Sequence, residues 1–222
     1  PWPDANARRF GDWLLSQYLP DIRKVGPCQV ANWQASAIEA RANIAVYTDR
    51  RDLYEEAIAD WRAWLPALIY DEADGPTPVR PPTCTTSLPD FWFGQTQMAA
   101  GLAQETCRDL DHTAYGLAAL INVAETDRLQ GGRLYAAGRA RLRAAMEFHT
   151  DMASRQDTPG WLCKGKLKGT VAGTFEVAYA HYAGREGSAL PLTRRWLDSH
   201  RPSRGYFHYR WETLTHGIPL GD

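Results

Sequence analysis

Four side chains that could transfer protons are spaced along residues 102–126, LAQETCRDLDHTAYGLAALINVAET. If this stretch forms one helix, Glu105, Arg108, His112 and Tyr115 fall on the same side, because an α-helix turns by about 100° per residue. An acid, a guanidinium, an imidazole and a phenol are the groups that proton-transfer sites use. The spacing therefore predicts a polar column with catalytic potential, and a solvated helix face that happens to carry these residues is the alternative.

A second polar column is expected on a helix over residues 31–47, ANWQASAIEARANIAVY. Asn32, Ser36, Glu39 and Asn43 lie within about 60° of one another on that helix. If the two columns face a shared cleft, amide groups that can bind a carboxylate would lie beside groups that can move a proton. The alternative for Asn32 is a helix N-cap, a position at which Asn is favoured.

Further polar and aromatic candidates lie later in the chain. Glu176 and Tyr179 are three residues apart in a helix predicted over residues 173–183, so they would share one helix face. Trp211 and His216 lie close together in the C-terminal tail. A half-buried core position is the alternative for Tyr179, and a tail that packs its Trp on the body of the protein is the alternative for Trp211.

Aromatic and basic residues favour a ligand that contains sugars. The chain has nine Trp, ten Tyr and six Phe, and aromatic rings flanked by polar groups suit the faces of sugar rings. Most of these rings must belong to the core, whereas Trp92, which follows a loop, is the candidate for ligand contact. The run of Lys164, Lys166 and Lys168 could attract an anionic polymer, with a solvated lysine loop as the alternative.

Helices must position these residues, because apolar side chains recur at helical spacing along most of the chain. A Pro- and Thr-rich loop over residues 71–89 leaves no room for a helix, and residues 205–211 could form a short strand. The predicted fold is all-α and consists of antiparallel helical hairpins. The predicted helices cover residues 4–19, 31–47, 51–65, 102–126, 134–151, 173–183 and 191–199, with Pro20 closing the first helix and Pro66 ending or kinking the third.

Composition and charge argue against several classes of protein. A net charge of −1 argues against a general nucleic-acid binder, which would carry a basic excess. No run approaches the roughly 20 apolar residues that a membrane span needs. We expect residues 1–222 to form a single domain, and we expect upstream sequence to be missing because the chain starts at Pro1 without an initiator Met.

The four cysteines are Cys28, Cys84, Cys107 and Cys163. They show no Cys-x-x-Cys or Cys/His spacing, so we expect no metal site and no other cofactor. An even number of cysteines permits two disulfides, but four buried thiols fit the sequence equally well.

Three segments, QETCRDLDHTAYGLAALINVAET, ANWQASAIEA and TFEVAYAHY, together resemble the alginate lyase domain family of polysaccharide lyases. The resemblance implies an incomplete (α/α) toroid of helical hairpins, with the substrate cleft along the inner helices. It also implies cleavage of a glycosidic bond next to a uronic acid by β-elimination, generally without a metal. We therefore expect an anionic polysaccharide or oligosaccharide as substrate, and a secreted or periplasmic location.

The resemblance also suggests roles for individual residues. Members of the family carry an Arg followed seven residues later by the Tyr that handles the proton, and Arg108 and Tyr115 match that spacing. Members also carry an Asn-His pair on an earlier helix, whereas Asn32 is followed here by Trp33. We expect Asn32 and Arg108 to bind the sugar carboxylate and Tyr115 to transfer the proton, with His112 as the competing base.

Other function classes stay open at this point. A glycoside hydrolase would use two carboxylates about 5 to 10 Å apart, such as Glu105 with Glu176 or Glu39. An inactive sugar-binding protein would keep the aromatic rings without turnover, and a structural scaffold would need no inward polar columns. For the lyase, the residues expected to contact substrate are Glu39, Trp92, Glu105, Glu176, Tyr179, Trp211 and His216.

Overall fold

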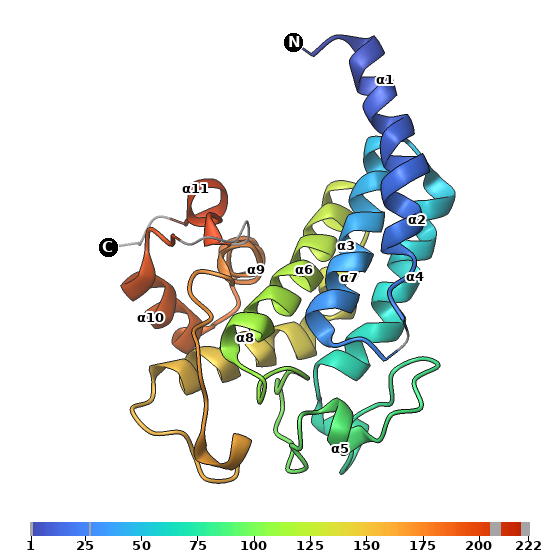
Figure 1. The fold of residues 1–222 in the computed structure, drawn as a ribbon. Coiled ribbons are helices and arrows are strands. Elements are labelled where there is room, and N and C mark those ends of the chain that lie inside the picture. The colour runs from blue at the N-terminus through green and yellow to red at the C-terminus, as the bar shows by residue number, and fades with distance from the viewer. Residues whose placement is uncertain (1, 27, 205–209, 219–222) are drawn as a thin grey trace.

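The computed structural model describes residues 2–26, 28–204 and 210–218, and helices dominate it (Figure 1). The described residues contain no β-strand, and only an isolated bridge pairs Ile69 with Ala103. The all-α prediction is therefore confirmed. Most of the possible strand over residues 205–211 lies outside the described residues.

Long and short helices alternate along the chain. The longer ones are α1 (Asp4–Trp13), α3 (Ala31–Tyr47), α4 (Arg51–Leu68), α6 (Leu110–Leu129), α8 (Arg139–Ser154) and α10 (Pro191–His200). The shorter α-helices are α2 (Leu19–Ile22), α5 (Leu88–Phe91), α7 (Leu134–Ala137), α9 (Glu176–Tyr179) and α11 (Thr213–His216). Two π-helical segments, η1 (Leu14–Tyr18) and η4 (Ala180–Arg185), extend neighbouring helices, and two 3₁₀ turns, η2 (Glu72–Asp74) and η3 (Cys163–Gly165), lie in loops.

Pro20 does not close the first helix as the sequence predicted, and Pro66, which was predicted to end or kink its helix, does not end it. Pro20 lies in the first turn of α2, where a missing N–H is tolerated, and the helix runs on to Ile22. Pro66 lies inside α4, which continues to Leu68. The bounds of α3 match the prediction, and the short joint from α3 to α4 makes these helices the predicted antiparallel hairpin.

The predicted helix over residues 102–126 begins eight residues later than expected. Asp109 is the N-cap of α6, and its carboxylate accepts a hydrogen bond from the His112 N–H at 2.8 Å. The preceding segment is a buried turn whose backbone bonds to the end of α4. Tyr70 N–H donates to the Leu102 carbonyl at 2.9 Å, and Gly101 N–H donates to the Tyr70 carbonyl at 2.9 Å. These bonds satisfy the backbone without a helix.

Helix α6 is the central element of the fold. It contacts α3, α4, α7 and α9, and it lies between α3 and α4 on one side and α9 on the other (Figure 1). Most of its residues are buried, and its apolar side chains surround the helix instead of forming one stripe, as expected for a helix covered on several sides. This arrangement is compatible with the predicted incomplete toroid.

A second group of helices packs beyond α6. Helix α10 contacts α8 and α9, and α11 contacts α9. The Glu147 carboxylate on α8 accepts hydrogen bonds from the Thr193 N–H and hydroxyl, both at 2.8 Å, so it caps the N-terminus of α10. Among the described helices, none combines the length and the apolar character needed to cross a membrane.

The four cysteines form two disulfides, Cys28–Cys84 and Cys107–Cys163. The sequence left this pairing open. The first bond ties the chain before α3 to the loop that follows α4. The second ties the residue before Arg108 to the lysine-containing loop at η3. Each bond closes a sequence separation of 56 residues.

Replacing both Cys107 and Cys163 with Ala should lower the free energy of unfolding by about 2 to 4 kcal/mol, because loop closure then no longer restricts the unfolded chain. Urea unfolding followed by circular dichroism measures the loss. The Cys28→Ala/Cys84→Ala variant is the matched control, since it opens a loop of equal length and should lose a similar amount. An unchanged unfolding midpoint in both variants would contradict the expectation.

Candidate active site

A buried carboxylate joins the start of α3 to the segment that precedes α6. Helix α3 begins without a side-chain cap of its own. Glu105 supplies one from 73 residues away, because its Oε2 accepts a hydrogen bond from the Asn32 N–H at 2.6 Å. The other carboxylate oxygen, Oε1, accepts one from Arg108 Nη1 at 2.7 Å. Glu105 thus fixes Asn32 and Arg108 relative to each other.

The neighbouring Gln104 extends this cap. Its Oε1 accepts a hydrogen bond from the Ala31 N–H at 2.8 Å, and its amide nitrogen donates to the Phe91 carbonyl. Both side chains are buried. Burial raises the pKa of Glu105, while the bonds from the Asn32 N–H and from Arg108 act in the opposite direction.

A glycine lets α6 approach this end of α3. A Cβ atom at Gly116 would lie 3.2 Å from the Asn32 backbone nitrogen and 3.4 Å from its Cα. A larger residue would therefore push the two helices apart next to Tyr115. Gly116 keeps the two predicted polar columns in contact.

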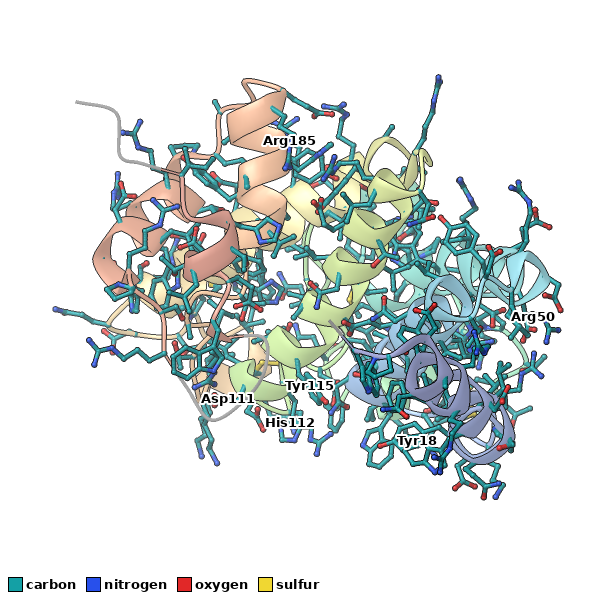
Figure 2. The ribbon with its side chains drawn as sticks, turned by 90° about the horizontal axis from the view of Figure 1, so that it is seen from above. Tyr18, Arg50, Asp111, His112, Tyr115 and Arg185 are labelled. Carbon is teal, nitrogen blue, oxygen red and sulfur yellow. A yellow bond between two sulfur atoms is a disulfide. The ribbon has the colours of Figure 1, made fainter. Side chains whose placement is uncertain are left out.

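Asn32 and Tyr115 line one pocket of about 470 Å³, as the sequence predicted. Tyr18 and Trp33 contribute aromatic rings to the same pocket, and Ser36 contributes a hydroxyl. Figure 2 shows Tyr115 beside His112 near the start of α6, with Tyr18 on the neighbouring N-terminal helical stretch. The pocket combines an aromatic side with a polar side, which suits a sugar ring.

Two polar atoms at this pocket are buried with no partner among the described residues: Asn32 Oδ1 and Ser36 Oγ. Asn32 is only 5 % exposed, and an unpaired buried polar atom costs about 1 to 3 kcal/mol. Asn32 is not the N-cap of α3, because that position is Val30. Its side chain is therefore not used for capping, and a polar ligand could bind it.

His112 and Arg108 do not line this pocket, but Arg108 shares Glu105 with the Asn32 N–H, and Figure 2 shows His112 beside Tyr115. The His112 Nδ1 lies 2.8 Å and 2.7 Å from the two Asp109 carboxylate oxygens. This contact leaves Nε2 as the ring nitrogen that can face a substrate. The side chains of His112 and Arg108 are 37 % and 32 % exposed, so solvent and ligands reach both.

Farther along, the two polar columns bind each other directly. Asn122 Nδ2 donates to Glu39 Oε1 at 2.9 Å, and the Thr126 hydroxyl donates to Asn43 Oδ1 at 3.2 Å. Burial raises the pKa of Glu39 to about 7, and the bond from Asn122 opposes this shift. In this part of the structure the two polar columns therefore face each other, as expected.

Three residues predicted to contact substrate are instead buried. Trp92 is 1 % exposed and belongs to the main hydrophobic core. Glu105 and Glu176 are both 0 % exposed, and each is paired with an arginine. Glu105 was predicted to share a helix face with His112 and Tyr115, but it lies in a turn before α6. Trp92 was predicted to contact a ligand because it follows a loop, but α5 folds this segment back onto the core.

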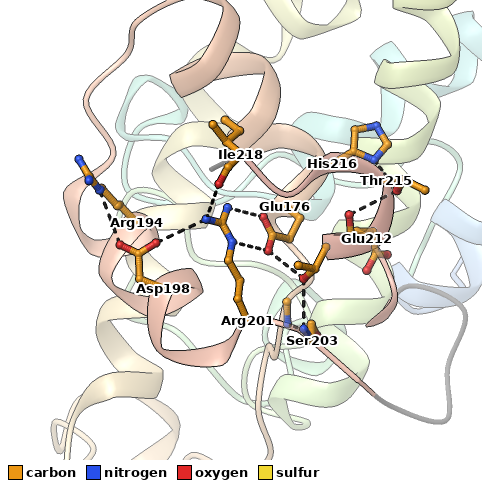
Figure 3. A network of polar contacts seen from close by, with 11 residues as sticks. Glu176, Arg194, Asp198, Arg201, Ser203, Glu212, Thr215, His216 and Ile218 are labelled. Carbon is orange, nitrogen blue, oxygen red and sulfur yellow. Dashed lines mark hydrogen bonds and ion pairs between the residues drawn. The ribbon is translucent and has the colours of Figure 1, made fainter. Parts of the chain in front are cut away.

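Glu176 does not line the pocket and belongs to the polar network that Figure 3 shows. Arg201 binds both carboxylate oxygens at 2.7 Å, and the Thr213 hydroxyl donates to Oε1 at 2.9 Å. Arg201 also donates to the Ile218 carbonyl at 2.9 Å. This network fastens the C-terminal segment to α9, which is a structural role.

The remaining predicted contact residues lie near this same end of the chain. Tyr179 is half-buried against the core, and burial raises its pKa. Trp211 is 48 % exposed. His216 Nε2 lies 3.8 Å from a Glu125 carboxylate oxygen. None of the three lines the pocket that holds Asn32 and Tyr115.

Some residues of the site were missed from the sequence. Tyr18 was not among the predicted site residues, yet it is 52 % exposed and lines the pocket. Phe10 and Trp13 on the same helical stretch are exposed as well, so no sequence signal marks Tyr18 as the pocket residue. Asp109 could have been found, because an Asp three residues before His112 is an N-cap signal. Among the described residues, no group of three His, Cys, Asp or Glu side chains could hold a metal ion.

Replacing Glu105 with Ala should lower the free energy of unfolding by about 3 kcal/mol, because the Asn32 N–H and Arg108 both lose a buried charged partner. Urea unfolding measures the change. Gln104→Ala is the matched control, since it removes a neutral cap from the same helix end and should cost about 1 to 2 kcal/mol. Equal losses in the two variants would show that the charge of Glu105 is unimportant.

Glu39 should make the protein less stable as the pH rises. The folded state holds the Glu39 proton up to a pKa of about 7, whereas the ordinary pKa of a glutamate carboxyl is 4.5, so stability falls between these values. Burial also raises the pKa of Glu212, to about 8, which adds to the same trend.

The Glu39→Gln variant should therefore lose less stability between pH 5 and pH 8 than the wild type, by up to about 3 kcal/mol. Unfolding in urea at the two pH values provides the comparison. An equal change in the free energy of unfolding between pH 5 and pH 8 in both proteins would contradict the raised pKa of Glu39.

Comparison with known proteins agrees with this geometry. The family model described as alginate lyase matches residues 2–159, which include α3, α6 and the pocket between them. No curated protein and no solved structure matches the chain. The match covers most of the chain and supports the activity of a polysaccharide lyase. The protein therefore belongs to the alginate lyase family.

Proposed function

We propose that this polysaccharide lyase cleaves a polyuronate, alginate-like or glucuronan-like, in the pocket shared by Asn32 and Tyr115. The observation that carries the proposal is the pairing in one pocket of a phenol with a buried amide whose oxygen has no partner among the described residues. A uronic acid supplies both hydroxyl donors for that oxygen and a carboxylate for the donors around it.

The first step is removal of the proton on C5 of the uronide. The negative charge that develops spreads onto the carboxylate oxygens, so hydrogen-bond donors placed there lower the barrier. The Asn32 amide nitrogen and the Arg108 guanidinium take this role. Glu105 holds both residues through its two oxygens, so neither donor has to be repositioned during the reaction.

The second step is loss of the leaving group. The C4–O4 bond breaks as the C4–C5 double bond forms, and the departing O4 receives a proton. Tyr115 can accept the C5 proton as a phenolate and return it to O4 as a phenol when both bonds lie on one face of the sugar. His112, with Nε2 facing outward, is the alternative base.

The two disulfides support a secreted or periplasmic location for the protein. Such bonds persist in oxidising compartments and are rare in the cytosol. A polysaccharide substrate is met in the same surroundings. The glycoside hydrolase alternative has less support, because Glu105 and Glu176 are both buried and paired.

Replacing Tyr115 with Phe should abolish formation of the unsaturated product while leaving the fold intact, because only the phenolic hydroxyl is removed. The measurement is ultraviolet absorbance during incubation with alginate and with glucuronan. Tyr47→Phe, which removes an exposed hydroxyl bonded to the Ala7 carbonyl, is the matched control and should stay active.

Undiminished absorbance with Tyr115→Phe would exclude the phenol from the mechanism. The His112→Ala variant would then be expected to be inactive. New reducing ends without unsaturated sugar, seen with the wild type, would indicate hydrolysis and overturn the proposed function.

A further inference from the structure

Lysines are concentrated in one loop of the chain. Only four residues are Lys, and three of them, Lys164, Lys166 and Lys168, lie within five positions. All three are exposed. Among the described residues no ion pair joins any of the three to an acid, whereas most arginines have such partners. The loop follows residue 159, where the match to the family ends.

The loop is held rigidly although its charges are in solvent. Leu162 is fully buried, and Leu167 packs against the core between two exposed lysines. The Cys163 N–H donates to Gln95 Oε1 at 2.9 Å, and the Leu167 N–H donates to the Thr158 hydroxyl at 3.2 Å. The lysines alternate with Gly165 and the partly buried Leu167, so their charges point outward from a backbone that is held in place, which lowers the entropy cost of binding.

Two connections place this loop beside the active site. The Cys107–Cys163 disulfide joins it to the residue before Arg108. The Leu110 N–H, at the first position of α6, donates to the Lys168 carbonyl at 2.7 Å. Tyr115 lies about 7 Å farther along α6, since a helix rises about 1.5 Å per residue. A polymer bound in the pocket can therefore continue over the loop.

The acids at this end of α6 are already paired. Asp109 binds His112, and Asp111 binds Arg210. Arg108 is likewise paired with Glu105, so the charges that face solvent here without an acidic partner among the described residues are those of the three lysines. A stripe of positive charge next to the pocket attracts a polyanion and weakens as salt screens it.

We propose that the loop carrying Lys164, Lys166 and Lys168 is an extended binding surface for the polyuronate chain outside the reacting sugar. The inference rests on the proposed function, because the same polymer must occupy the pocket. It predicts that the enzyme prefers long chains to short ones, since only a long substrate reaches both the pocket and the loop.

The test uses the double variant Lys166→Glu/Lys168→Glu. Lys164 is left unchanged because its φ of 57° is already strained for a non-glycine residue. KM for polymeric alginate or glucuronan should rise about fivefold to tenfold, as two rim charges are reversed. The kcat for a trisaccharide should stay at the wild-type value, which also shows that the variant is folded.

Arg62→Glu is the matched control, because it reverses an exposed charge on α4, which lies on the other side of α6 from the loop (Figure 1). It should leave KM for the polymer unchanged. Affinity electrophoresis in gels containing the same polyuronate gives a readout without turnover, with a neutral glucan gel as reference. The double variant should migrate with less retardation than the wild type in the polyuronate gel alone.

The outcomes separate the two proposals. A wild type that forms no unsaturated product from any polyuronate overturns the proposed function. A wild type that is active, with an unchanged polymer KM in the double variant, overturns the extended surface only. Equal retardation of the wild type by duplex DNA, together with an unchanged KM, would identify the loop as a nonspecific anion-binding patch and also overturn the inference.

Discussion

The arrangement of the active site depends on one buried carboxylate. Glu105 binds the N-terminal amide of α3 with one oxygen and Arg108 with the other. The start of α3 has no cap of its own and carries a partial positive charge. The Glu105 carboxylate neutralises both this charge and that of the Arg108 guanidinium. Since Glu105 is fully buried, breaking either bond would leave an unpaired charge or donor in the interior. The site geometry is consequently tied to the stability of the fold.

The sequence predicted the helices more reliably than their junctions. Periodicity identified α3 and α4, since their apolar positions recur over many turns. It extended α6 too far toward the N-terminus, because Glu105 and Arg108 happen to fit the helical spacing of His112 and Tyr115. The real constraint there is tertiary: the turn bonds to the end of α4, a contact that has no local signal.

The candidate site was predictable in part for similar reasons. Asn32 and Tyr115 could be paired because each lies on a regular helix and the family resemblance marks both positions. Glu176 was assigned to the wrong kind of role, since its partner Arg201 is 25 residues away and nothing local indicates the pair. The burial of Trp92 was unpredictable for the same reason. The sequence around a large ring in a loop does not indicate whether the ring points into the core or into solvent. Burial of single side chains depends on which elements meet, and a sequence pattern does not specify that.

The two disulfides have a simple order along the chain. Cys28 pairs with Cys84 and Cys107 pairs with Cys163, so the two closed loops follow one another and do not overlap. Four cysteines allow three pairings, and this one joins each cysteine to the nearest neighbour in order of synthesis. Cys28 and Cys84 are synthesised before Cys107 and Cys163, so within residues 1–222 consecutive thiols are partners and their oxidation in this order needs no later exchange.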